Sequence, residues 1–265
     1  MGKKIVFIDC DNTLVYINED YEQCIPESAF NIIKKARDMG ILVYLCTGRS
    51  LSELDGPVSE VEFDGIIGGS GAFILEDGDI IYERVMDYED VKEIIEFMEK
   101  EKVTYFIEGN DGIYANKMTR DFFKKDRMTV MLGDIMRPIE EADLSKVNKI
   151  EYMSSVFSAE EVNNNLKNKY DIVGYSYGKQ ACGGEISTKG ISKGSAVRYV
   201  LEAKGIDIND SYGIGDSGND IEMFKNTGTA IAVGNASDEV KRFANYISKD
   251  ADEDGIEYAF INNIF

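Results

Sequence analysis

The 265-residue chain contains no histidine. It therefore lacks the commonest general base of enzymes, every histidine-based catalytic triad and every histidine-containing zinc site, so carboxylates must carry any acid–base chemistry. Cysteine is scarce as well. No Cys-x-x-Cys pair and no spacing typical of zinc ligands occurs among Cys10, Cys24, Cys46 and Cys182. We expect these four thiols to be reduced and packed in the interior.

Long apolar runs are missing too. No stretch approaches the roughly 20 residues that span a bilayer, and the run after Lys3 and Lys4 stops at Asp9, so a signal peptide is not expected. Basic residues are outnumbered, with 29 Lys and Arg against 49 Asp and Glu, which gives a formal net charge of −20. This balance disfavours nucleic acid and anionic membranes as partners. The sequence predicts a soluble cytoplasmic protein.

Two aspartates follow the first apolar run of the chain. Residues 5–8 are typical of a buried strand, Asp9 comes directly after them, and Asp11 follows two residues later. In a parallel α/β sheet, ligands lie beyond the carboxyl ends of the strands. Two acids held close together repel each other, so they indicate a raised pKa or a bound cation. Mg²⁺, held by one or two carboxylates and partnered by a phosphate, fits that requirement.

Strand and helix patterns alternate at both ends of the chain. Apolar residues at helical spacing follow Pro26, and buried strands are expected at 41–46 and 65–67. The alternation returns after about residue 185, where Ser192 can cap a helix and residues 211–215 and 229–233 form strands. This order predicts an α/β fold with a Rossmann-like, doubly wound parallel sheet, formed by residues 1–82 and 186–265.

Residues 83–185 have a different pattern. An amphipathic helix is expected at 90–102, strands at 104–107 and 112–114, and a segment rich in glycine and tyrosine, typical of turns and an exposed strand, at 173–184. We predict that residues 83–185 form a separate α+β domain inserted into the core.

Four sets of polar residues follow the predicted core strands or lie near their ends. Because such ends meet along one edge of a parallel sheet, we expect these sets to lie together. Four carboxylates, one hydroxyl and one ammonium suit phosphoryl transfer, in which positioning and charge stabilisation supply most of the catalysis. The four sets are Asp9 with Asp11, Thr47, Lys193, and Asp216 with Asp220.

These sets resemble the motifs of the haloacid dehalogenase superfamily of phosphohydrolases, and within it the Cof-like, type IIB sugar-phosphatase group. The resemblance covers essentially the whole chain. Four motifs in order, with an insert of about a hundred residues between the second and third, are far more specific than a lone Asp-x-Asp. The motifs are Asp9-Cys10-Asp11-Asn12-Thr13, Leu45-Cys46-Thr47-Gly48-Arg49, Ser192-Lys193-Gly194 and Gly215-Asp216-Ser217-Gly218-Asn219-Asp220.

The resemblance implies a role for each acid. Asp9 looks like the nucleophile that becomes an aspartyl-phosphate, and Asp11 like the general acid that then serves as base. A role for Asp11 only in metal binding or capping stays open. Asp9, Asp11 (through its backbone carbonyl), Asp216 and Asp220 look like the residues around Mg²⁺.

The phosphate-binding residues follow from the same resemblance. Thr47 and Gly48 look like the residues that hold the transferring phosphoryl group, and Asn219 like one that contacts phosphate or orients Lys193. Lys193 looks like the phosphate-binding lysine because Ser-Lys-Gly opens a helix, where backbone N–H groups also favour an anion. Lys189 is its rival, although a solvated surface position suits Lys189 better.

The resemblance therefore implies a Mg²⁺-dependent phosphomonoesterase acting on small phosphorylated metabolites, with sugar phosphates first. The insert would act as a cap that excludes water and shapes the choice of leaving group. Cap side chains such as Tyr175, Tyr177 and Lys117 are candidate substrate contacts. Two alternatives stay open: a phosphotransferase or mutase that uses a sugar hydroxyl as acceptor, and a non-catalytic sugar-phosphate sensor on the same fold.

Overall fold

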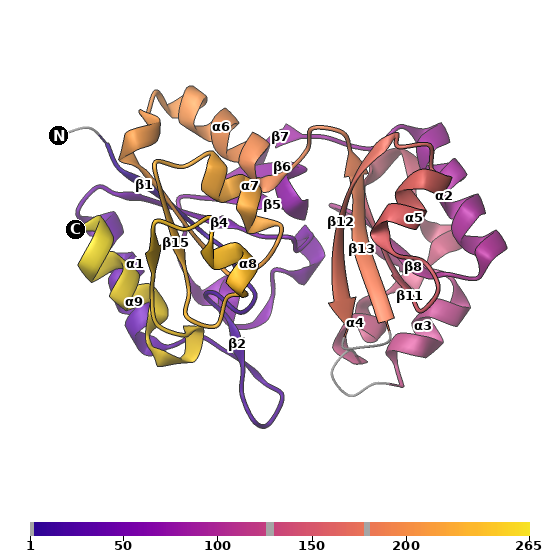
Figure 1. The fold of residues 1–265 in the computed structure, drawn as a ribbon, viewed down its shortest axis with the longest axis horizontal. Helices are drawn as coiled ribbons and strands as arrows, with labels where there is room; N and C mark the ends of the chain where they lie inside the picture. The colour runs from indigo at the N-terminus through magenta and orange to yellow at the C-terminus, as the bar shows by residue number, and fades with distance from the viewer. Residues whose placement is uncertain (1–2, 126–129, 178–180) are drawn as a thin grey trace. The chain divides into compact units, whose positions relative to one another are not determined.

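The strand β1 (Ile5–Ile8) lies at the centre of the larger sheet, and all four of its side chains are buried. It pairs in parallel with β4 (Leu42–Cys46) on one side and with β14 (Ser211–Gly215) on the other. A parallel strand covered on both faces is apolar at every position, as this one is. The computed structural model describes residues 3–125, 130–177 and 181–265 (Figure 1).

The larger sheet has eight strands in the order β16-β15-β14-β1-β4-β5-β6-β7. Pairing is parallel from β16 to β5, and the edge formed by β5, β6 and β7 is antiparallel. The predicted Rossmann-like fold class is confirmed, and the antiparallel pair of β6 and β7 forms one edge of the sheet. The remaining strands are β5 (Gly65–Gly68), β6 (Phe73–Glu76), β7 (Asp79–Glu83), β15 (Thr229–Ala232) and β16 (Tyr246–Ile247).

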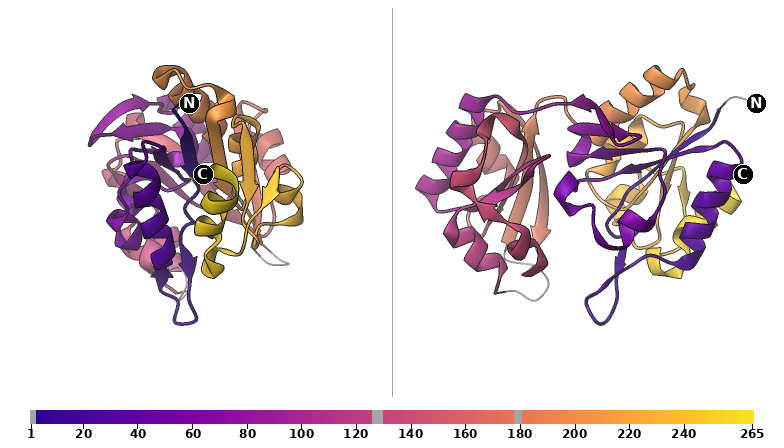
Figure 2. Two further views of the ribbon diagram at one scale, coloured as in Figure 1. Left: turned by 90° about the vertical axis from the view of Figure 1, so that its left-hand side faces the viewer. Right: turned by 180° about the vertical axis from the view of Figure 1, so that it is seen from behind.

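Helices cover both faces of this sheet (Figure 2). One face carries α1 (Glu27–Asp38) packed with α9 (Gly255–Ala259), and the other carries α6 (Lys193–Lys204) packed with α7 (Asp220–Lys225). The apolar stripe of α1 is buried, as its helical spacing predicts. Smaller elements of this unit are α8 (Asp238–Lys241) and a hairpin of β2 (Tyr16–Ile17) and β3 (Gln23–Cys24).

A second unit is built on a six-stranded sheet in the order β10-β9-β8-β11-β13-β12. The helices α2 (Tyr88–Glu101) and α5 (Ala159–Asn165) bury apolar side chains in one cluster with this sheet, and α3 (Lys117–Phe123) contributes to a smaller cluster. A further helix is α4 (Val130–Ile135). The strands are β8 (Thr104–Gly109), β9 (Gly112–Ala115), β10 (Arg137–Pro138), β11 (Val147–Ser154), β12 (Tyr170–Tyr177) and β13 (Ala181–Thr188).

The chain divides into two compact units. One unit contains residues up to 49, 54–83 and from 192 onward, and the other contains residues 50–53 and 84–191. The second boundary lies after 185 because β13 continues to Thr188, paired with β12. The segment 50–53 joins the second unit because its short 3₁₀ turn, Leu51–Glu53, packs against β9. No described helix in either unit has the length and apolar character needed to cross a membrane.

Candidate active site

The core strands deliver polar side chains at their carboxyl ends. Asp9 follows β1, Thr47 follows β4 and Asp216 follows β14. The backbone N–H of Asp9 still donates to the carbonyl of Ile214 at 2.9 Å, so sheet pairing continues up to this side chain. Three segments far apart in the sequence therefore present their side chains at one edge of one sheet.

Three of the predicted metal-binding acids lie together. Asp9, Asp216 and Asp220 each place a carboxylate oxygen within 4.8 Å of the other two. Among residues 3–125, 130–177 and 181–265, no other group of three or more acidic, cysteine or histidine side chains has this spacing. Hard divalent cations such as Mg²⁺ prefer oxygen ligands, so this donor set fits the implied ion.

The electrostatics of the group also favour a cation. Burial raises the pKa of Asp9 well above its ordinary value, and the charges of Asp220 and Asp216 raise it further. Burial, followed by the charge of Asp220, raises the pKa of Asp216 to about 7. Acids that resist ionisation when close together become stable as carboxylates once positive charge is nearby.

Lys193 supplies one such positive charge. Its Nζ donates to Asp9 Oδ1 at 2.5 Å and to Asp220 Oδ1 at 2.7 Å, and its side chain is 1% exposed. Burial alone lowers the pKa of Lys193, but Asp220 and Asp9 raise it well above the ordinary lysine value. The ammonium group is therefore charged, whereas its sequence rival Lys189 is exposed in the second unit.

The start of α6 fixes Lys193 in place. The Ser192 hydroxyl accepts from the backbone N–H of Ser195, so Ser192 is the predicted helix cap. Gly71, with φ of +103°, packs so closely that a Cβ there would lie 2.2 Å from the Ser192 carbonyl oxygen. A glycine is needed at this position both for its backbone conformation and for the close approach.

Asp220 organises the loop that precedes α7. Its Oδ2 accepts from the backbone N–H groups of Asp216 and Ser217, both at 3.0 Å, while its Oδ1 receives Lys193. Asn219 accepts from the Ser217 hydroxyl at 2.9 Å, within the same loop. The contact that orients Lys193 is thus made by Asp220. Thr13, which the sequence reasoning did not single out, donates to Asp216 Oδ1 at 3.4 Å and joins this loop to the first motif.

Thr47 is buried at the end of β4. Its backbone N–H donates to Ile67 at 2.8 Å, its carbonyl accepts from Ser70 at 3.0 Å, and its hydroxyl accepts from the Arg49 N–H at 3.0 Å. Gly48 lies inside this turn. An accepting hydroxyl can still donate its own proton, so Thr47 retains the hydrogen bond that a phosphoryl oxygen requires.

Asp11 stands apart from the three other acids. Its carboxylate accepts from Arg49 Nη2 at 2.6 Å and from Arg49 Nε at 3.1 Å, and its side chain is 56% exposed. The Asp11 side chain therefore lies outside the three-carboxylate group. Arg49 was not among the predicted site residues, although its place directly after Thr47-Gly48 was a usable signal.

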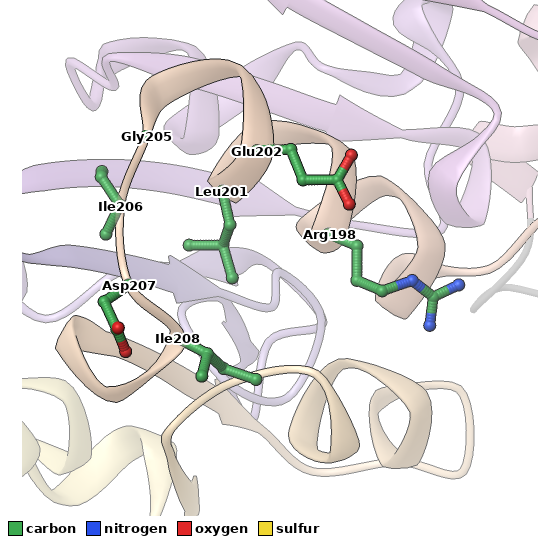
Figure 3. A pocket seen from close by; sticks show the side chains of 7 residues that line it. All are labelled: Arg198, Leu201, Glu202, Gly205, Ile206, Asp207 and Ile208. Carbon is green, nitrogen blue, oxygen red and sulfur yellow. The ribbon is translucent and has the colours of Figure 1, made fainter.

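A surface hollow and the three candidate substrate contacts belong to other parts of the chain. The hollow of Figure 3 lies at the carboxyl end of α6 and is lined by Arg198, Leu201, Glu202, Gly205, Ile206, Asp207 and Ile208. Lys193 begins the same helix, roughly 15 Å away at 1.5 Å per residue. In the second unit, Lys117 pairs with the exposed Asp121, and the side chains of Tyr175 and Tyr177 lie outside the described residues.

Comparison with known proteins places this geometry in a family. Residues 6–260 match the family model of the haloacid dehalogenase-like hydrolases. The chain belongs to this family. It is 26% identical to Putative phosphatase YkrA of Bacillus subtilis, over 98% of this chain and 97% of that protein. It is 27% identical to YwtE of the same organism, named a 5-amino-6-(5-phospho-D-ribitylamino)uracil phosphatase, over 98% of each chain.

Solved structures agree with this assignment. The haloacid dehalogenase subclass IIB sugar phosphatase BT4131 is 27% identical, with a TM-score of 0.76 over 98% of each chain. The phosphatase BT1666 from Bacteroides thetaiotaomicron has a TM-score of 0.81 at 22% identity, over 98% of this chain and 94% of that one, which shows the shared fold. The predicted Cof-like phosphatase of the haloacid dehalogenase superfamily is confirmed.

Proposed function

We propose that this haloacid dehalogenase-like enzyme is a Mg²⁺-dependent phosphomonoester hydrolase that acts on sugar and sugar-alcohol phosphates through an aspartyl-phosphate. One observation carries the reaction: Asp9, Asp216 and Asp220 gather within 4.8 Å, and the ammonium of Lys193 contacts Asp9. The substrate class is supported by the names of two relatives, a subclass IIB sugar phosphatase and a phosphatase of a phosphoribityl compound.

The first half-reaction transfers the phosphoryl group to the protein. A carboxylate oxygen of Asp9 attacks phosphorus, the ester P–O bond breaks, and Asp11 gives a proton to the leaving alkoxide. Lys193 offsets the charge of Asp9 and of the transferring group. A divalent ion held by Asp9, Asp216, Asp220 and the Asp11 carbonyl would supply further neutralisation of the phosphoryl oxygens.

The second half-reaction restores the enzyme. Asp11, now a carboxylate, takes a proton from water as the water oxygen attacks phosphorus and the bond to Asp9 breaks. Thr47, Gly48 and Asn219 hold the phosphoryl oxygens during both transfers, and the second unit serves as the cap that limits access of bulk water. Inorganic phosphate then leaves.

The test uses p-nitrophenyl phosphate, which reports hydrolysis by colour. We expect steady turnover with Mg²⁺, loss of turnover on chelation, recovery when Mg²⁺ is restored, and loss by at least about 10³-fold in Asp9→Asn, because the nucleophile is gone. The control is Asp38→Asn, which removes an exposed carboxylate paired with Lys34 and should retain full activity. Turnover that survives both chelation and Asp9→Asn would contradict the proposal.

Product analysis separates hydrolysis from transfer. If a sugar hydroxyl replaces water as acceptor, adding an acceptor sugar should yield a new phosphorylated sugar at the expense of inorganic phosphate. A sensor that does not catalyse would show no turnover at all. The presence of every acid that the reaction requires, together with Lys193, favours the hydrolase over the sensor.

A further inference from the structure

Arg49 forms a bidentate ion pair with the carboxylate of Asp11. Nη2 donates to Oδ1 at 2.6 Å and Nε donates to Oδ2 at 3.1 Å, so both carboxylate oxygens are engaged by one planar group. This bidentate geometry fixes orientation as well as distance, which a single hydrogen bond does not. The bidentate ion pair therefore restricts the direction in which the Asp11 side chain points.

Arg49 is itself held on several sides. Its side chain is 9% exposed, and Nη2 also donates to Gln23 Oε1 at 3.2 Å. Its backbone N–H donates to the Thr47 hydroxyl at 3.0 Å, and its carbonyl accepts from the Gly69 N–H at 2.9 Å. A guanidinium whose own position is fixed loses little freedom when it fixes another group.

Because of this ion pair, the carboxylates of Asp9 and Asp11 have different surroundings, although the two residues are only two positions apart. Asp9 joins the three-carboxylate group, whereas the Asp11 carboxylate faces Arg49 instead. At 56% exposure, the Asp11 side chain would otherwise be free to rotate toward solvent or toward a cation. The two hydrogen bonds from Arg49 therefore fix the direction of the Asp11 carboxylate.

We propose that Arg49 is the positioning residue for proton transfer by Asp11, an inference that rests on the hydrolase reaction proposed above. As the ester P–O bond breaks and the Asp9–phosphorus bond forms, the proton passes from Asp11 to the leaving oxygen, and negative charge appears on the carboxylate in front of the guanidinium. Charge that develops beside a fixed cation is stabilised in the transition state more than in the ground state.

This role predicts a dependence on the leaving group. Activated phenolates depart with little help, whereas poorer leaving groups need the proton. A residue that only binds phosphate, or only supports the fold, would change all substrates by the same factor. A residue that positions the acid should matter most for the poorest leaving group.

The experiment measures kcat/KM over a series of substituted phenyl phosphates, from p-nitrophenyl phosphate to phenyl phosphate. We expect Arg49→Gln to lose roughly 100-fold on phenyl phosphate and less than about tenfold on p-nitrophenyl phosphate, within the range of general acid catalysis. Asp11→Asn should show the same steepened dependence, and the double variant should be no steeper than Asp11→Asn. Arg49→Lys, which keeps the charge without the fork, should fall between wild type and Arg49→Gln.

Arg37→Gln is the matched control because Arg37 also pairs with two carboxylates of the core, those of Glu62 and Asp64, outside the site. Its leaving-group dependence should equal that of the wild type. The ratio of kcat/KM between two substrates is measured on one preparation of each variant, so the effect of any unfolded fraction cancels in the ratio. A uniform loss in Arg49→Gln, or no loss, overturns the positioning role alone. Absence of wild-type turnover on every phosphate ester overturns the hydrolase reaction and this inference together.

Discussion

At the scale of single residues, one ammonium group balances a set of buried acids. The Nζ of Lys193 lies 2.5 Å from Asp9 Oδ1 and 2.7 Å from Asp220 Oδ1, and the Lys193 side chain is 1% exposed. When one partner of a buried ion pair is removed, the remaining charge stays in a poorly solvated place. In the proposed reaction, the same contact would therefore support both catalysis and the stability of the fold.

Replacing Lys193 should weaken both. Lys193→Met leaves Asp9 and Asp220 without their ammonium, so we expect the free energy of unfolding to fall by about 3 kcal/mol in the absence of metal. Urea unfolding in the presence of a chelator measures this loss, and turnover of p-nitrophenyl phosphate should fall at least about 100-fold. Lys189→Met, at an exposed position, is the control. Equal stability of the two variants would show that Lys193 is not needed to balance the acids.

Asp216 makes the stability of the metal-free protein depend on pH. Its pKa in the folded protein is raised to about 7, whereas an unfolded chain has a value of about 4. The folded protein thus binds this proton more tightly, so the contribution of Asp216 to stability is full below pH 4 and is lost as pH rises toward 7, by up to about 1.4 kcal/mol per pH unit.

Thermal or urea unfolding across this pH range, with chelator present, measures the effect. Asp216→Asn should flatten the decline because the titrating group is gone, and the difference between the two proteins cancels the contribution of other groups. Mg²⁺ should raise the melting temperature more at pH 8 than at pH 5, since protons compete with the ion for carboxylate oxygens. A wild-type decline as shallow as that of Asp216→Asn would contradict the assignment.

Sequence reasoning worked best for residues that a general rule of sheets controls. Asp9 and Asp216 follow buried parallel strands, and the rule that such strand ends meet was sufficient to expect them together. That rule does not predict which residue pairs with the Asp11 carboxylate. Whether Asp11 faces the other acids or Arg49 depends on side-chain directions and on the support from Gln23, which spacing along the chain does not reveal.

At the scale of elements, the turn Gly69–Gly71 connects two parts of the site. The N–H of Ser70 donates to the Thr47 carbonyl, and Gly71 lies against the Ser192 carbonyl at the start of α6. The turn therefore sets the spacing between the residue expected to hold phosphate and the helix that carries Lys193. The sequence has three glycines within residues 68–71, but it does not reveal which neighbours make glycine necessary.

Gly71→Ala should disturb this connection. The new Cβ would lie 2.2 Å from the Ser192 carbonyl oxygen at φ of +103°, so we expect a loss of more than about 1 kcal/mol in unfolding free energy and a lower kcat. Gly78→Ala is the control, because Gly78 also has positive φ, at +87°, but has open space around it. It reports backbone strain without the clash. Equal loss of stability and unchanged turnover in both variants would mean that the close approach to α6 is unimportant.

At the scale of the whole molecule, the chain forms one interrupted unit and one inserted unit. The alternation of helix and strand patterns at both ends of the chain is the signal from which an insert was predicted. The inclusion of Ser50–Glu53 in the second unit was not predictable, because only the three-dimensional packing of this turn against β9 reveals it. The segment 173–184, expected to hold turns and an exposed strand, contains parts of β12 and β13, which pair with each other, and β13 also pairs with the more distant β11.

The position of β1 between β4 and β14 has a consequence for biosynthesis. One neighbour of β1 leaves the ribosome soon after it, whereas the other, Ser211–Gly215, is made only after the entire inserted unit. Until then an apolar parallel strand has an unpaired edge, which is a site for mistaken association with other chains. The completed sheet must close a very long segment of chain, so its assembly should be slow compared with that of the local elements around it.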